Sequence, residues 1–206
     1  MDLSHPAYAL LGENTIRVLD CLAVLADSAS GHRIHELSRV KALRTTQRVL
    51  ARLTEIGLVD IRPVGLANQY SLNRAHILWE PIRTLLATPA RLDEQISLIL
   101  SKTFTMHIAG AALYGPSLRG DATNGSNIGV LIVWATNDAV TGRVEFIDKA
   151  SEQIRRLTGN PVQVLPVTQA ELTDLTLTDD PLIESLRANA RWLIGGFDFD
   201  QLIRNA

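Results

Sequence analysis

The sequence predicts a two-domain protein with an α+β domain first, a helical connector next and an α/β domain last. Three observations predict this fold class. The first third shows helical periodicity followed by two short alternating segments, the middle shows helical periodicity alone, and the last half alternates apolar runs with amphipathic stretches. The chain has 206 residues, 46% of them hydrophobic, which is enough for two small cores. We expect the parts to span residues 1–76, 77–104 and 105–206.

The first third is expected to form three helices and a β-hairpin. Apolar spacing predicts a helix over Glu13–Ala26, a short helix that contains Ile34 and Leu37, and a third helix over Arg44–Ile56, which Gly57 ends. The residues that follow alternate like strands over 58–62 and 69–72, with a glycine turn within 63–68.

The third helix is expected to have a polar outer face. Its apolar stripe contains Val49, Leu50, Leu53 and Ile56, so that Arg44, Gln47, Arg48 and Ala51 point outward. Residues 31–74 carry eight basic and three acidic side chains, although the whole chain has a net charge of −2. This segregation favours a polyanionic partner for one part of the chain, and an ordinary solvated face is the alternative.

The segments Thr45–Leu50, Ile56–Val59 and Tyr70–Asn73 resemble the recognition helix and wing of winged helix-turn-helix repressors. One departure is Ala42, where many relatives have a serine or threonine cap. The resemblance implies binding to double-stranded DNA. The residues expected to contact DNA are Lys41, Arg44, Thr45, Gln47, Arg48 and Arg62. Protein docking or a scaffold role is the alternative, but the outer face of the third helix lacks aromatic or aliphatic anchors.

The connector is predicted to contain two helices within Ile77–Phe104, separated at Thr88–Pro89. It is more apolar than a free linker requires. Two interpretations stay open: the helices pack between the domains, or they form a dimer interface. A homodimer would supply the two reading heads that two half-sites need.

The last half alternates strands and helices. The predicted strands are Met106–Tyr114, Ile128–Trp134 and Val162–Val167, and the predicted helices are Arg143–Leu157 and Pro181–Ile194. Gly115 directly follows the first strand, where a glycine allows a tight turn and the close approach of a ligand.

Gly115, Leu118–Gly120 and Ser126–Val133 resemble, in their spacing, the active-site segment of minimal nucleotidyltransferases. In that family a glycine-serine pair holds nucleotide phosphates, and two aspartates at the start of the next strand bind magnesium. Here the corresponding positions hold Pro116, Asn127 and Gly129, and no carboxylate comes from 162–167. Neutral groups do not replace carboxylates around two divalent cations.

We therefore expect no catalytic residues, no metal and no cofactor in this domain. Nucleotidyl transfer should be absent, and the domain would serve dimerisation, sensing of a small molecule, or binding of a protein. The residues that would remain of a nucleotide site are Gly115, Ser117, Arg119 and Asn127. The alternatives are a nucleotidyltransferase with full or residual activity, and a component of a toxin-antitoxin pair.

The remaining sequence features indicate a cytoplasmic protein. The single cysteine, Cys21, lies among apolar residues and cannot form an internal disulfide, which fits a reducing compartment. No apolar run is long enough to span a bilayer, and the first ten residues do not resemble a signal peptide. His32 and His35 lie close together, but no cysteine or third ligand is near in sequence, so we expect them to be structural or surface residues.

Overall fold

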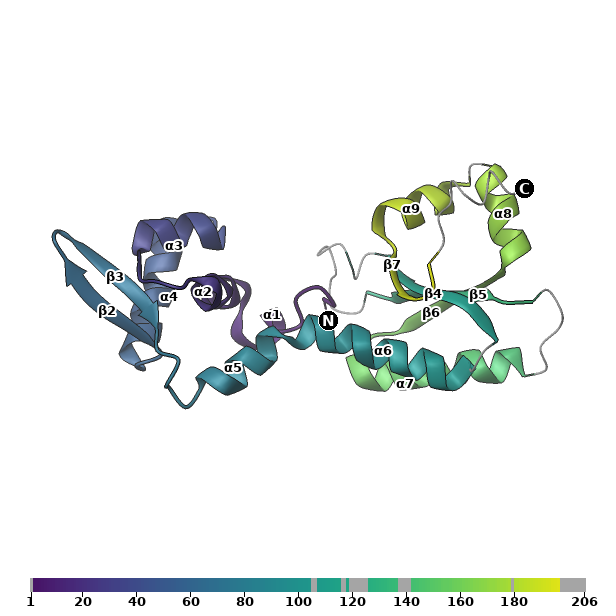
Figure 1. The fold of residues 1–206 in the computed structure, drawn as a ribbon, viewed down its shortest axis with the longest axis horizontal. Helices are drawn as coiled ribbons and strands as arrows, with labels where there is room; N and C mark the ends of the chain where they lie inside the picture. The colour runs from purple at the N-terminus through teal and green to yellow at the C-terminus, as the bar shows by residue number, and fades with distance from the viewer. Residues whose placement is uncertain are drawn as a thin grey trace. The chain divides into compact units, whose positions relative to one another are not determined.

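The computed structural model describes residues 2–104, 107–115, 118, 126–136, 142–178 and 180–196 (Figure 1). The chain divides into two compact units. We call Pro6–Thr88 the N-terminal unit, and Pro89–Ala206 together with Met1–His5 the C-terminal unit. Both units contain helices and a sheet, so the protein is of mixed α and β structure, as the sequence predicts. In the described part of the chain, no helix is long and apolar enough to cross a membrane.

The N-terminal unit is built of short helices and a small antiparallel sheet, with strand order β1-β3-β2. Its elements are α1 (Tyr8–Leu11), α2 (Glu13–Val24), β1 (Ala29–Ser30), α3 (Gly31–Ser38), α4 (Leu43–Glu55), β2 (Val59–Val64), β3 (Ala67–Leu72) and α5 (Trp79–Leu86). The predicted helices and hairpin are confirmed within about two residues at most ends. Gly57 follows α4 with φ of 77°, which only glycine adopts at little cost.

Residues from all of the longer elements fill the core of this unit. Leu19, Leu22, Ile34, Leu50 and Leu58 are each at most 1% exposed. Cys21 is buried among them, as expected from its apolar neighbours, and desolvation by burial raises the pKa of its thiol. The apolar side chains of α2, α3 and α4 therefore hold the three helices together.

Two details of this unit differ from the prediction. The strands extend further than expected, so that Pro63 lies in β2 opposite Asn68 and the turn is confined to Gly65 and Leu66. The short strand β1 also pairs with β3, at Ala29 and Tyr70. Pairing between strands depends on distant backbone groups, which local alternation does not reveal.

The C-terminal unit has a four-stranded mixed sheet of order β6-β5-β4-β7. Its elements are α6 (Thr88–Phe104), β4 (Ile108–Tyr114), β5 (Ile128–Trp134), α7 (Arg143–Thr158), β6 (Val162–Thr168), α8 (Gln169–Leu177), α9 (Pro181–Asn189) and β7 (Arg191–Ile194). Only β5 and β6 are parallel, and α7 connects them. Figure 1 shows α6 and α7 on one face of this sheet and α8 and α9 on the other.

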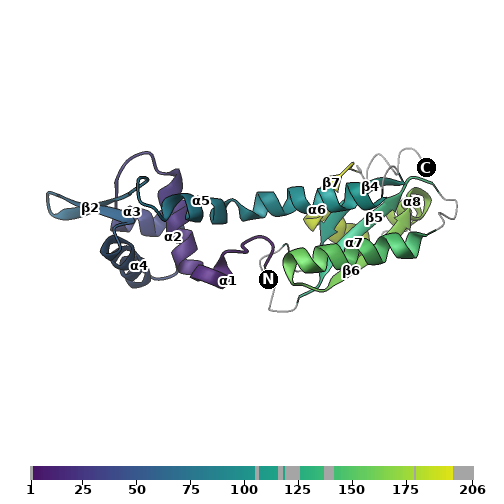
Figure 2. The same ribbon diagram turned by 90° about the horizontal axis from the view of Figure 1, so that it is seen from below.

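Both faces of the sheet are covered, and every residue of β5 is buried. Alternate residues such as Val130 and Ile132 pack with α6 and α7 in one cluster, which also contains an edge-to-face pair of Phe104 and Trp134. Leu131 and Val133 pack with α8 and α9 in a second cluster. Figure 2 shows the long α6 and α7 beside the sheet from a second direction.

The predicted helix over Pro181–Ile194 is wrong in its second half. Helix α9 ends at Asn189, and Arg191–Ile194 is extended as β7, which pairs antiparallel with β4. Helix α8 was not predicted. The free backbone groups at the edge of β4 offer hydrogen bonds that outweigh the local helical pattern.

The connector also differs from the prediction. Its helices separate at Ala87, and Pro89 lies in the first turn of α6, where a missing N–H costs no helical bond. Trp79, Ile82 and Leu86 of α5 pack into the core of the N-terminal unit. The apolar face of α6 packs on the sheet of the C-terminal unit. The connector is thus divided between the two units.

Candidate nucleic-acid interface

Helix α4 has one buried and one exposed face. Thr46, Leu50 and Leu53 are buried. Arg44, Gln47, Arg48 and Ala51 are exposed, so the predicted orientation of this helix is confirmed. The outward face thus presents two guanidinium groups and one amide, without a large apolar side chain between them.

A buried polar contact and a turn position α4 against α3. The Nδ1 atom of His35 lies 3.0 Å from the hydroxyl oxygen of Thr46, which is 0% exposed. The turn between the helices passes through Arg39, whose φ is 54°, and through Val40, which is buried. His35 therefore has a structural role, because its contact with Thr46 helps to orient α4 against α3.

The amino terminus of α4 lacks a side-chain cap. Ala42 occupies the cap position, and its carbonyl oxygen accepts hydrogen bonds from the N–H groups of Thr45 and Thr46. Its methyl group cannot bond the first N–H groups of the helix. The positive end of the helix dipole therefore stays available to an anion next to Lys41 and Arg44.

The cations around this terminus are not neutralised. Arg39, Lys41, Arg44 and Arg48 are exposed, and none forms an ion pair with another residue in the described part of the chain. Some other arginines of the N-terminal unit pair with nearby acids, such as Arg17 with Glu13 at 2.8 Å and Arg33 with Glu36 at 3.3 Å. Four basic side chains without an ion-pair partner among the described residues thus lie close together around the start of α4, and Arg52 and Arg62 are further exposed arginines without one.

The structure brings five of the six residues expected to contact DNA together. Lys41, Arg44, Thr45, Gln47 and Arg48 lie on α4 or directly before it. Arg62 is exposed on β2, opposite Gln69. Thr45 is half-buried and, together with Arg48 and Asn14, lines a surface hollow of about 350 Å³.

Two neighbours of this surface were not predicted. A smaller hollow of about 190 Å³ is lined by Arg39, Lys41, Thr45 and Asn14. Arg39 contributed to the basic excess in the sequence, so its charge was the available signal. Asn14 belongs to α2, and only the packing of α2 against α4 brings it here.

In the C-terminal unit, the residues that resemble a nucleotidyltransferase site are described in part. Gly115 has φ of 97°, which supports the expected turn after β4. Asn127 is exposed just before β5. Pro116, Ser117 and Arg119 lie outside the described residues.

Gly129 has no room for a side chain. A Cβ atom at this position would lie 2.8 Å from two ring carbons and from the carbonyl oxygen of Tyr114. Burial raises the pKa of the Tyr114 phenol, so this ring stays neutral in its pocket. Gln163 of β6 is the partner of Gly129 in the sheet register. The described strand ends are thus neutral where the resembling family has carboxylates.

The described residues contain no group of three or more histidine, cysteine, aspartate or glutamate side chains that could hold a metal ion. Comparison of the chain with protein-family models found no match, and comparison with curated proteins found none either.

Proposed function

We propose that this protein is a sequence-specific DNA-binding transcriptional regulator, in which the N-terminal unit is a winged helix-turn-helix and α4 is its recognition helix. The observation that carries the proposal is the outward face of α4, where Arg44, Gln47 and Arg48 are exposed and the two arginines have no ion-pair partner among the described residues.

The chemistry of this face suits duplex DNA. Arginine can donate two hydrogen bonds to guanine, and glutamine can pair with adenine, in the major groove. Arg39, Lys41 and the uncapped N–H groups of α4 suit phosphate oxygens, which set the register of a protein on DNA. Arg62 on the hairpin β2–β3 would contact the backbone as part of the wing.

The C-terminal unit is proposed to be a nucleotidyltransferase-like domain without catalysis, used for dimerisation, for sensing or for holding a partner. Two neutral strand-end residues, Asn127 and Gly129, support this role. The Tyr114 ring fills the space beside Gly129 that a metal-binding carboxylate would need.

Selection of binding sites from a random duplex library, followed by gel shifts on the selected sequence and on DNA upstream of the protein's own operon, would test the proposal. Replacing both Arg44 and Arg48 with alanine should weaken binding to the selected site by about a hundredfold, since each specific arginine contact contributes on the order of 1–3 kcal/mol. The matched control is the double variant Arg83→Ala and Arg155→Ala, which removes two exposed arginines that are paired with Glu80 and Glu152.

The control variant should bind the selected site as the unchanged protein does. If no sequence is enriched at moderate salt, or if the α4 variant and the control bind equally well, the protein is not a regulator of this kind. Binding that persists without sequence preference would show a nonspecific polyanion contact instead.

A further inference from the structure

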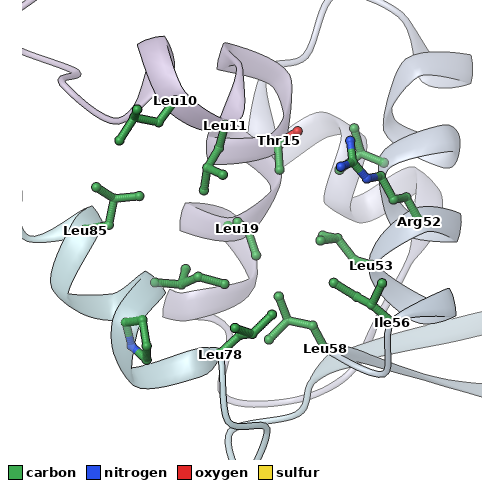
Figure 3. Close-up of a pocket in the computed structure, with 13 residues that line it drawn as sticks. Leu10, Leu11, Thr15, Leu19, Arg52, Leu53, Ile56, Leu58, Leu78 and Leu85 are labelled. Atoms are coloured by element: carbon green, nitrogen blue, oxygen red, sulfur yellow. The ribbon is translucent and has the colours of Figure 1, made fainter.

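The N-terminal unit contains an apolar pocket that the proposed DNA contact does not use. It has a volume of about 400 Å³ and lies between α1, α2, α4 and α5. Figure 3 shows side chains from these helices converging on it, among them Leu11, Leu19, Leu53 and Leu85. Its volume is within the range of cavities that bind small molecules.

Part of the pocket lining is exposed, whereas Leu19, Leu53 and Leu58 are at most 5% exposed. Leu10 is 75% exposed, Ile56 is 48% exposed and Leu78 is 44% exposed. Ile56 was expected to be part of the buried stripe of the third helix, and its exposure here reflects the open pocket. Apolar side chains grouped around a concavity favour a bound apolar group.

The polar side chains stand at one end of the pocket. Figure 3 shows Arg52 and Thr15 near each other, and all other residues that line the pocket are apolar. Arg52 is exposed and forms no ion pair with any described residue. A guanidinium and a hydroxyl beside an apolar cavity are complementary to a ligand with one anionic group and a hydrocarbon body.

We propose that this pocket binds a small amphipathic monocarboxylate, with the carboxylate at Arg52 and Thr15 and the hydrocarbon part among the leucines of α1, α2 and α5. The single guanidinium matches one carboxylate in charge, and the pocket provides no second cation for a more highly charged group.

A regulatory consequence rests on the proposed DNA binding. Arg52 is one helical turn after Arg48 on α4, so the two side chains are neighbours along the same helix. A carboxylate bound at Arg52 brings negative charge to the recognition helix and reduces its attraction for phosphates. Ligand binding should therefore weaken DNA binding.

Titration calorimetry of the full chain with octanoate, and with 1-octanol as the uncharged probe of equal chain length, tests the site without DNA. Octanoate should bind saturably and more tightly than 1-octanol. Arg52→Gln should weaken octanoate by about tenfold and leave 1-octanol unchanged, because it removes a charge-assisted hydrogen bond. Arg91→Gln, at an exposed arginine of the C-terminal unit that does not line the pocket, is the matched control and should bind octanoate normally.

A second pair of variants tests the apolar wall of the pocket. Ile56→Gln should weaken both probes, and because Ile56 is half-exposed this variant should fold. Val24→Gln, at a residue that is 84% exposed and does not line the pocket, is its control. Circular dichroism confirms that each variant is folded.

The proposal is overturned if the folded protein does not bind octanoate saturably, or if Arg52→Gln and Arg91→Gln bind octanoate equally well. It is also overturned if sedimentation shows a dimer that Ile56→Gln dissociates and octanoate leaves intact, since the pocket would then be an interface between two copies. Gel shifts with and without octanoate are a separate arm: binding of octanoate without any binding of DNA supports the site and rejects the proposed function.

Discussion

The start of α4 in the N-terminal unit and the arginine pairs of the C-terminal unit differ in whether their positive charges are compensated. Around the start of α4 in the N-terminal unit, Arg39, Lys41, Arg44 and Arg48 are exposed and form no ion pair among the described residues. In the C-terminal unit, Arg155 pairs with Glu152 at 2.8 Å and Arg191 pairs with Asp93 at 2.9 Å, while Arg91 and Arg156 are exposed and form no ion pair among the described residues. Unpaired cations on one surface cost little in water and remain available to a polyanion. The charge of an arginine that is paired with a carboxylate is already compensated within its own unit.

The starts of two helices differ in the same way. Helix α8 begins with a complete capping box, in which the Thr168 hydroxyl accepts from the N–H of Glu171 and the Glu171 carboxylate accepts from the N–H of Thr168. Helix α4 begins at Ala42 without a side-chain cap. The α4 terminus proposed to meet DNA thus lacks the local stabilisation that the capping box gives to α8.

The largest expected effect tests whether the strand end of the C-terminal unit can hold a charge. Gly129→Asp should lower the free energy of unfolding by about 3 kcal/mol, because it combines overpacking against Tyr114 with burial of a carboxylate. Urea unfolding followed by circular dichroism measures this. Gly196→Asp is the control, since a Cβ atom there would meet nothing within 4 Å.

The opposite result for Gly129→Asp would contradict the proposal that the C-terminal unit has no catalytic site. If the variant is as stable as the control and binds manganese, or if the unchanged protein transfers label from nucleoside triphosphates in the presence of magnesium, the C-terminal unit has a functional catalytic site. We expect neither result.

The next effect concerns the missing helix cap at the start of α4, where stability and DNA affinity are expected to change in opposite directions. Ala42→Asp should raise the free energy of unfolding by about 1 kcal/mol, because Ala42 already has the extended backbone of a cap residue and the carboxylate would bond the first N–H groups. The same carboxylate should weaken DNA binding by about tenfold, since it occupies those donors and repels phosphate.

Ala42→Asn separates the effect of a helix cap on stability from the effect of a negative charge on DNA binding. Asparagine caps a helix without a negative charge, so this variant should gain stability with a smaller loss of DNA affinity. Denaturant unfolding and gel shifts on the same preparations measure the two quantities. If Ala42→Asp binds DNA more tightly than the unchanged protein, the start of α4 does not face phosphate.

The smallest effect concerns the capping box of α8 and its dependence on pH. Thr168→Ala should lower the free energy of unfolding by about 1 kcal/mol. Thr173→Ala, which removes an exposed hydroxyl within α8, should lower it by less. The hydrogen bond from the backbone N–H of Thr168, and then that from its hydroxyl, lower the pKa of Glu171.

A lowered carboxyl pKa in the folded state determines the sign of the pH dependence. The stabilisation by Glu171 is fully present above the ordinary pKa of a glutamate, about 4.3, and is lost as the pH falls through the lowered folded value. The urea midpoints of the unchanged protein and of Glu171→Gln should therefore differ above that range and become equal at its acid end. A constant difference at all pH values would contradict this role.

Local patterns predicted the elements whose own residues decide their conformation. The run Ile128–Trp134 was predicted as a strand and forms β5 with the same bounds, because seven consecutive residues without a charged side chain suit a strand covered on both faces. Helix α4 and its polar face were predicted from spacing alone. The second half of Pro181–Ile194 was predicted wrongly, because its pairing with β4 depends on a partner about 80 residues away.

For the candidate sites, the sequence by itself determined which side chains are charged, which are neutral and which face of α4 carries Arg44, Gln47 and Arg48. These properties follow from residue chemistry and the helical period. Three contacts became visible only in the folded structure. Tyr114 fills the space beside Gly129, and Asn14 adjoins the α4 surface. Leu10, Arg52 and Leu85 line one pocket. These contacts join residues far apart in the chain, and packing of helices and strands, rather than any local preference, brings such residues together.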